Sequence, residues 1–190
     1  GLYKIFLMHT TLDKAKGSLP IDAIEADNLP PMDYYALGHL HMDFQYNNFV
    51  YPGPIFPNNF QELEDLKYGS FYIVDAAGFN SKPNLRKIDL KIKDVETFDI
   101  TLNTSIDGTD KIINEIKKRE IENKIVLLRV SGELESGKTS DIKFQQIEEF
   151  IKQKGAYILL KNTHDLTTKE VELRIETKDS ENIEEKTIEL

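Results

Sequence analysis

The chain has 190 residues, enough for one large domain or two small ones, and its share of hydrophobic residues, 39%, is typical of a soluble globular protein. No apolar run approaches the roughly 18 residues of a transmembrane helix, and the first residues lack the pattern of a signal peptide. The absence of cysteine excludes disulfides and thiolate metal sites and favours an intracellular location. The net charge of −9 argues against a generally basic nucleic-acid binder, but not against a nuclease, because bound divalent metals reverse the local field.

The first half of the chain is expected to be rich in strands. Residues 3–8 form an apolar run typical of a buried strand, whereas residues 87–92 alternate charged and aliphatic side chains, as in a half-buried strand. Residues 21–29 are expected to form a short helix that ends at Pro30, and residues 63–66 a polar connection. Further strands are expected at residues 34–37, 49–51 and 70–74.

From about residue 98 the pattern changes to strands that alternate with amphipathic helices. One helix is expected over residues 110–119, with Thr109 or Asp110 as its N-cap, and another over residues 141–154, ended by Gly155. Strands are expected at residues 99–102, 124–130, 157–160 and 171–175. The predicted domains are residues 1–97 and 98–177, followed by a charged tail, residues 178–190.

Residues 132–139, Gly-Glu-Leu-Glu-Ser-Gly-Lys-Thr, match the phosphate-binding P-loop pattern letter by letter, between an expected strand and an expected helix. Such a loop points backbone amides at phosphates, and Glu133 and Glu135 would place negative charge beside them. No apolar strand ending in aspartate supplies a second magnesium ligand. We therefore interpret the segment as a connection to a capped helix, and keep nucleotide binding through Lys138 as an alternative.

Three of the four histidines follow expected strands in the first half. His9 ends the first apolar run, and His39 and His41 follow the next strand across Gly38. Because side chains alternate in an extended backbone, His39 and His41 point the same way. Three imidazoles at one sheet edge suit Mn²⁺, Fe²⁺ or Zn²⁺, although histidine pairs with this spacing also occur without a metal. A two-metal site also needs bridging carboxylates, for which the candidates are Asp13, Asp33 and Asp43. His164 is interpreted as a loop residue.

A specific resemblance is carried by five segments in a fixed order. They are the apolar strand ending in His9, residues 34–41 (Tyr-Tyr-Ala-Leu-Gly-His-Leu-His), residues 51–54 (Tyr-Pro-Gly-Pro), residues 60–64 (Phe-Gln-Glu-Leu-Glu) and residues 69–74 (Gly-Ser-Phe-Tyr-Ile-Val). The chain thereby resembles the second half of the calcineurin-like metallophosphoesterases of DNA double-strand-break repair, the meiotic-recombination-eleven or SbcD nucleases, and especially their archaeal branch. The resemblance implies an α/β (α+β) fold: the second half of a β-sandwich with flanking helices over residues 1–97, then a small α+β DNA-capping domain over residues 98–177.

The resemblance also implies a metal site and partners. Complete members bind two manganese ions, so His9 and His39 would ligate one Mn²⁺ and His41 the other. The Asp-x-His, Gly-Asp and Asn-His-Asp motifs of the family, and with them the catalytic histidine, are not in this chain. We therefore expect a carboxyl-terminal fragment of a manganese-dependent DNA exo- and endonuclease that is inactive alone. Expected partners are DNA, a coiled-coil SMC-like repair ATPase of the Rad-fifty/SbcC type reached through the tail, and a second copy in the complete protein. The expected location is cytoplasmic and nucleoid-associated, with no membrane partner.

Two alternatives stay open beside nucleotide binding. One is another phosphodiesterase of the same superfamily, acting on small molecules or nucleotides. The other is a noncatalytic interaction module that binds an ATPase partner through its acidic tail. The capping domain and residues 60–74 favour the nuclease over the first alternative.

Overall fold

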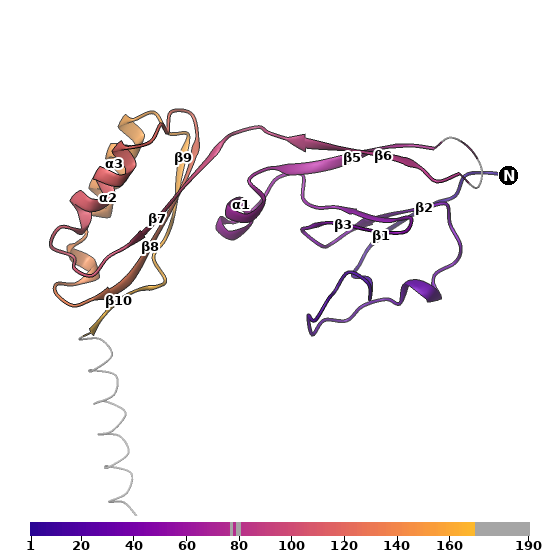
Figure 1. Cartoon of the computed structure of the whole chain (residues 1–190), viewed down its shortest axis with the longest axis horizontal. Helices are drawn as coiled ribbons and strands as arrows, with labels where there is room; N and C mark the ends of the chain where they lie inside the picture. Colours follow the sequence, from indigo (N-terminus) through magenta and orange to yellow (C-terminus); the bar gives the residue numbers. More distant parts are fainter. Residues whose placement is uncertain (77, 79–80, 170–190) are drawn as a thin grey trace, which may run out of the picture. The chain divides into compact units, whose positions relative to one another are not determined.

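The computed structural model describes residues 1–76, 78 and 81–169 and divides into two compact units, unit 1 (Gly1–Ile92) and unit 2 (Lys93–Leu190) (Figure 1). Both units combine strands with helices, so the fold class is mixed α/β. The boundary lies a few residues before the expected change of pattern at residue 98, because the first strand of unit 2 already begins at Val95. Within the described residues no helix is both long and apolar enough to span a membrane.

A four-stranded sheet forms the centre of unit 1. Its strands are β1 (Ile5–His9), β2 (Tyr34–Gly38), β3 (Asp43–Tyr46) and β4 (Phe49–Pro52). They lie in the order β1-β2-β4-β3, with β1, β2 and β4 parallel and β3 antiparallel to β4. One face packs on a small core that includes Leu12, Tyr35, Leu37, Phe49 and Tyr51. The strands expected at residues 34–37 and 49–51 are thus confirmed, whereas the short polar strand β3 was not expected.

Strand β1 is not buried as its apolar sequence predicted. It stands first in the sheet order and pairs only with β2, so one edge has no neighbouring strand among the described residues. Phe6 and Met8 pack against the core, but Ile5 is 54% exposed and Leu7 is 78% exposed. An apolar run predicts that a strand forms, but it cannot say whether a second layer covers both of its faces.

The connection between β1 and β2 contains only the 3₁₀ turn η1 (Ala26–Asn28) in place of the helix expected over residues 21–29. Ile24 forms a parallel bridge with Leu12, and its amide donates to the carbonyl oxygen of Thr11 (2.9 Å). This pairing holds the backbone extended at Ile24, so a helix cannot pass through it. The helix prediction was therefore wrong for most of its length.

Helix α1 (Phe60–Leu66) covers the segment that was expected to be a polar connection, so that prediction was also wrong. The N-cap Asn59 accepts a hydrogen bond from the Glu62 amide (2.9 Å), and the Glu62 carboxylate accepts one from the Asn58 amide (3.0 Å). This reciprocal capping starts a helix that is too short to show a hydrophobic period.

An antiparallel ribbon of β5 (Gly69–Asp75) and β6 (Asn84–Leu90) completes unit 1. Polar contacts join it to β3: the Tyr72 hydroxyl donates to Asp43 Oδ1 (2.7 Å) and accepts from Gln45 Nε2 (2.7 Å). Lys87 Nζ also pairs with Asp43 Oδ2 (2.8 Å). The strand expected at residues 70–74 is confirmed, and the one expected at 87–92 lies earlier in the chain than predicted.

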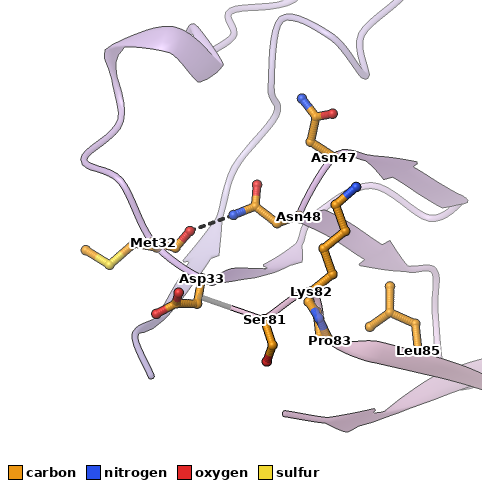
Figure 2. Close-up of a pocket in the computed structure, with 8 residues that line it drawn as sticks. All are labelled: Met32, Asp33, Asn47, Asn48, Ser81, Lys82, Pro83 and Leu85. Carbon is orange, nitrogen blue, oxygen red and sulfur yellow. Dashed lines mark hydrogen bonds between the residues drawn. The ribbon is translucent and has the colours of Figure 1, made fainter. Parts of the chain in front are cut away.

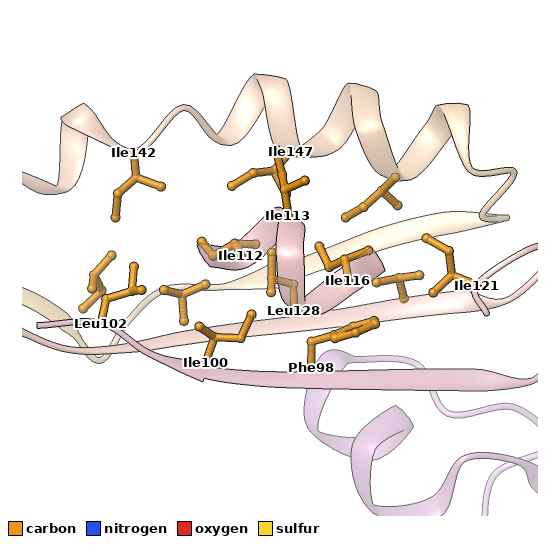
Figure 3. Packing of buried hydrophobic residues seen from close by; sticks show 14 of the residues in the cluster. Phe98, Ile100, Leu102, Ile112, Ile113, Ile116, Ile121, Leu128, Ile142 and Ile147 are labelled. Atoms are coloured by element: carbon orange, nitrogen blue, oxygen red, sulfur yellow. The ribbon is translucent and has the colours of Figure 1, made fainter. Parts of the chain in front are cut away.

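Unit 2 is a parallel sheet with two helices. Its elements are β7 (Val95–Thr101), α2 (Gly108–Lys117), β8 (Ile125–Leu134), η2 (Thr139–Asp141), α3 (Phe144–Gln153), β9 (Ile158–Asn162) and β10 (Leu166–Thr168). β8 pairs with β7 on one side and with β9 and then β10 on the other, all parallel. Both helices cover one face of the sheet over a core rich in isoleucine (Figure 3).

The alternation of strands and helices expected for unit 2 is confirmed, with shifted ends. Helix α2 begins at Gly108 after Asp107, so neither Thr109 nor Asp110 is its N-cap. Helix α3 ends before Gly155 (φ 80°), as expected, but Ile142 is buried from the turn ahead of the helix. Strand β10 was not expected. The strand expected at residues 171–175 and the tail at 178–190 lie outside the described residues.

Candidate functional site

The parallel pairing of β1 and β2 brings His9 and His39 together. The register pairs His9 with Gly38, the last residues of the two strands, so His39 follows at the same carboxyl edge of the sheet. The two imidazole rings lie edge to face, with centroids 5.2 Å apart. The carboxyl ends of parallel strands are where α/β proteins place ligands. The expected meeting of these two histidines is therefore present in the structure.

The backbone at this point is shaped for close contact. A Cβ at residue 38 would lie 3.0 Å from His9 Nδ1, so glycine lets the His9 ring approach the chain. His39 has a φ of 94°, a conformation that non-glycine residues adopt at a cost of about 1–3 kcal/mol and that clusters at ligand sites. At the same edge, an open depression of about 430 Å³ is lined by Leu7, Met8, His9, Ala36, Leu37 and Gly38.

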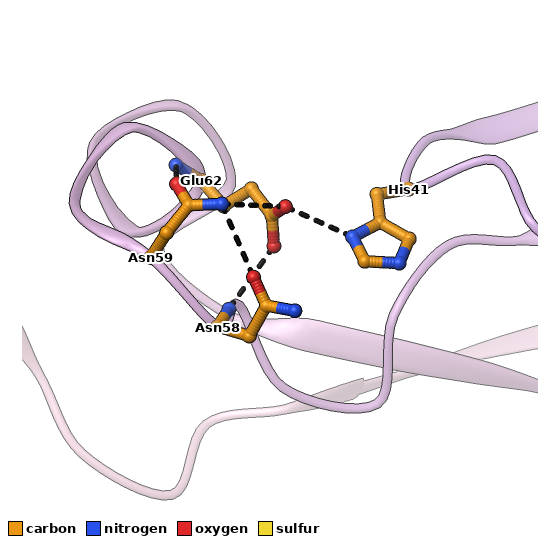
Figure 4. Close-up of polar contacts among 4 residues, drawn as sticks. All are labelled: His41, Asn58, Asn59 and Glu62. Atoms are coloured by element: carbon orange, nitrogen blue, oxygen red, sulfur yellow. Dashed lines mark hydrogen bonds and ion pairs between the residues drawn. The ribbon is translucent and has the colours of Figure 1, made fainter.

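His41 lies in the loop after β2, which ends at Gly38, and His39 has a positive φ. The extended backbone expected to point His39 and His41 the same way is therefore not present, and His41 makes a different contact. Its Nδ1 is 2.9 Å from Glu62 Oε1 on helix α1 (Figure 4). The pKa of Glu62 is lowered, first by the hydrogen bond from the Asn58 amide and then by the contact with His41. Glu62 did not stand out as a site residue in the sequence, although its position three residues after Asn59 is the capping signal that starts α1.

The three carboxylates considered as bridging ligands bond to other groups. Asp13 pairs with Lys14 (2.7 Å), and Asp33 accepts a hydrogen bond from the Lys4 amide (2.7 Å). Asp43 is bound by the tyrosine and lysine of the β5–β6 ribbon described above. Among the described residues, no group of three or more His, Asp or Glu side chains is arranged to hold a metal.

A pocket of about 530 Å³ lies at the other end of β2 from the histidines, and Figure 2 shows the residues that line it. Its lining residues are Met32, Asp33, Asn47, Asn48, Ser81, Lys82, Pro83 and Leu85. Asp33 precedes β2, whereas His39 follows it, so the length of a five-residue strand, about 16 Å, separates this pocket from the histidine edge. The pocket and the histidines are thus separate features of unit 1.

The side chains present fit part of a transition-metal site. Neutral imidazole is a good ligand for Mn²⁺, Fe²⁺ and Zn²⁺, and His9 and His39 approach each other at a ligand-binding edge. A site with two metals also needs carboxylates, and none joins these histidines among the described residues. The described residues therefore supply the imidazole part of such a ligand set.

The P-loop-like segment does not have P-loop geometry. Gly132 to Leu134 belong to strand β8 and pair with β10, and α3 begins only at Phe144. A P-loop instead wraps backbone amides around phosphate directly before a helix. In this chain the Lys138 amide donates to Asp141 Oδ2 (2.7 Å), which occupies it. The expected loop therefore begins later than predicted, and the geometry argues against the nucleotide-binding alternative.

His164 lies in the turn after β9, as expected, and its amide donates to Asn162 Oδ1 (3.1 Å). It belongs to unit 2, away in sequence from the histidine edge of unit 1.

Comparison with known proteins adds no family: no family model matches the chain, and no curated protein matches it significantly.

Proposed function

We propose that this chain is the carboxyl-terminal part of a calcineurin-like metallophosphoesterase, a manganese-dependent DNA nuclease of double-strand-break repair. The observation that carries the proposal is the pairing of His9 and His39 at the carboxyl ends of two parallel strands. The sequence resemblance implies these two histidines and His41 as the imidazole ligands. Unit 1 would then hold the second half of the catalytic β-sandwich, and unit 2 would be the DNA-capping domain.

The uncovered face of β1 supports the idea of a missing half. Ile5 and Leu7 are largely exposed on a parallel sheet, although such sheets are usually covered on both faces. In the proposed complete enzyme, upstream strands would cover this side of β1. They would also supply the carboxylates and the catalytic histidine that the described residues do not bring to the histidine edge.

Each residue of the site has a defined part in the proposed reaction. His9 and His39 would hold one Mn²⁺ and His41 the other, each through a neutral ring nitrogen. When bound, two such cations activate a water, clamp the scissile phosphate and stabilise charge during an in-line attack. The strained turn at His39 and the absence of a side chain at Gly38 would fix where the first two imidazoles lie before a metal arrives.

The proposed partners follow from the same assignment. DNA would be the substrate, a coiled-coil repair ATPase would bind beyond the tail, and the complete nuclease would be a cytoplasmic, nucleoid-associated homodimer. For this chain by itself, a noncatalytic role in binding the ATPase is the second candidate. It is favoured because no carboxylate joins His9 and His39 in a metal-holding group within the described part of the chain.

A manganese titration tests the metal assignment, with binding followed by electron paramagnetic resonance of the free ion. We expect binding that is lost in a His39→Ala, His41→Ala double variant and kept in His164→Ala, a matched control in unit 2. Unchanged binding in the double variant would remove the ligand assignment. Sequencing of the natural protein ahead of Gly1 tests the nuclease itself: the absence of an upstream Asp-x-His segment would contradict it.

A further inference from the structure

The contact between His41 and Glu62 joins the loop after β2 to the first turn of α1. These residues are 21 positions apart, and the contact is 2.9 Å long (Figure 4). The Glu62 side chain is 19% exposed, whereas His41 is 46% exposed. The more buried carboxylate is therefore the fixed partner, and the imidazole is the group that is held.

Three further hydrogen bonds fix Glu62 independently of His41. Its Oε2 accepts from the Asn58 amide (3.0 Å), and its Oε1 accepts from Asn59 Nδ2 (2.8 Å). Its own amide donates to Asn59 Oδ1 (2.9 Å). The carboxylate is thus tied to the start of α1 on both oxygens, and a glutamate carboxylate is ordinarily ionised at neutral pH.

The chemistry of the contact determines which nitrogen of His41 carries the proton. An ionised carboxylate only accepts hydrogen bonds, so Nδ1 of His41 must be the donor. In the neutral ring, a proton on Nδ1 leaves the lone pair on Nε2. Figure 4 shows the second ring nitrogen facing away from Glu62, and the His41 side chain is 46% exposed.

We propose that Glu62 is a positioning residue that holds His41 as the Nδ1–H tautomer and presents Nε2 as its ligating atom. Naming that ligand as manganese rests on the proposed function, but the choice of tautomer does not. Histidine ligands are generally oriented by such a carboxylate or carbonyl on the other ring nitrogen, and removal of that partner weakens metal binding by about 10–100-fold. In this chain the partner is built into the cap of a short helix.

The test uses the ¹⁵N-labelled chain and two-dimensional NMR at about pH 8.5, where an ordinary histidine is neutral. The chain has four histidines, and the His41→Ala spectrum identifies the signals of His41. We expect Nδ1–H at His41 in the unchanged chain and a shift toward Nε2–H in Glu62→Ala. The control variant Asp65→Ala, which removes another carboxylate of α1, should keep the Nδ1–H form.

Manganese affinity, measured on the same samples, gives the second readout. We expect Glu62→Ala to bind about 10–100-fold more weakly than the unchanged chain, and Asp65→Ala to bind about as tightly as the unchanged chain. Nε2–H in the unchanged chain, or a tautomer that Glu62→Ala does not alter, would overturn the role of Glu62. Equal manganese affinity in Glu62→Ala and the unchanged chain would also overturn it. If the unchanged chain binds no manganese, the proposed metal function fails, and the tautomer measurement still decides the role of Glu62.

Discussion

The exposed side of β1 gives a quantitative prediction, in which Leu7→Ala is compared with Leu37→Ala on the neighbouring strand. Leu7 is 78% exposed and has therefore lost only about one fifth of its accessible surface, whereas Leu37 is 4% exposed. Burying a whole leucine contributes about 1.5–3 kcal/mol, so Leu7→Ala should cost about 0.3–0.7 kcal/mol. The weaker strand propensity of alanine adds to this loss, and the total should stay below about 1 kcal/mol. Leu37→Ala, a deletion inside a packed core, should cost about 2–5 kcal/mol.

Urea unfolding followed by tyrosine fluorescence is the suitable assay. Seven of the eight tyrosines lie in unit 1, only Tyr157 lies in unit 2, and there is no tryptophan. The signal therefore reports on the unit that contains both leucines. A loss above about 2 kcal/mol for Leu7→Ala would refute the exposed face of β1, because only a buried leucine can account for it. In a longer protein that contains the proposed upstream half, the same substitution should approach the loss seen for Leu37→Ala.

Two further predictions concern unit 1. Gly69→Ala should lower the free energy of unfolding in the same assay by about 1–3 kcal/mol, because the added Cβ would lie 1.7 Å from the Ile55 carbonyl oxygen. An unchanged free energy of unfolding would contradict this close approach. Asp13 has a lowered pKa, caused first by its hydrogen bond with Lys14 and then by the Ala26 amide. Its stabilisation should be present at neutral pH and lost as the pH falls below about 3.9 through the lower folded pKa. Asp13→Asn should therefore be less stable than the unchanged chain at pH values near neutrality and equal to it in acid, and a gap that persists in acid would contradict the assignment.

Strand patterns and residue order were enough to predict that His9 and His39 meet at one sheet edge, but the third imidazole expected there, His41, contacts Glu62 instead. An apolar run that ends in His9 and another that ends at Gly38 imply parallel strands with a common carboxyl edge, and the structure pairs these two residues. The alternation of strands and helices in unit 2 was predicted equally well, since α2 and α3 each carry buried isoleucines on one face.

The features that the sequence did not predict are short elements and contacts between residues far apart in the chain. Helix α1 has seven residues, too few to show a hydrophobic period, so its capping residues are its main signal in the sequence. Strand β3 is polar and short, and it is held by a hairpin in which Asn47 has a φ of 52°. The role of Glu62 follows from a contact 21 residues away, which no local pattern encodes.

The pairing of β8 has a consequence for how unit 2 opens. Residues Ile125 to Arg129 have a hydrogen-bonded strand on each side, and β8 continues beside β10 to Leu134. Val126 and Leu128 are also fully buried beneath the helices. No outer strand can leave without uncovering this central one, so opening of β8 requires the whole unit to come apart. The amides of β8 should therefore exchange with solvent hydrogen only through global unfolding of unit 2, and should be the slowest to exchange in that unit.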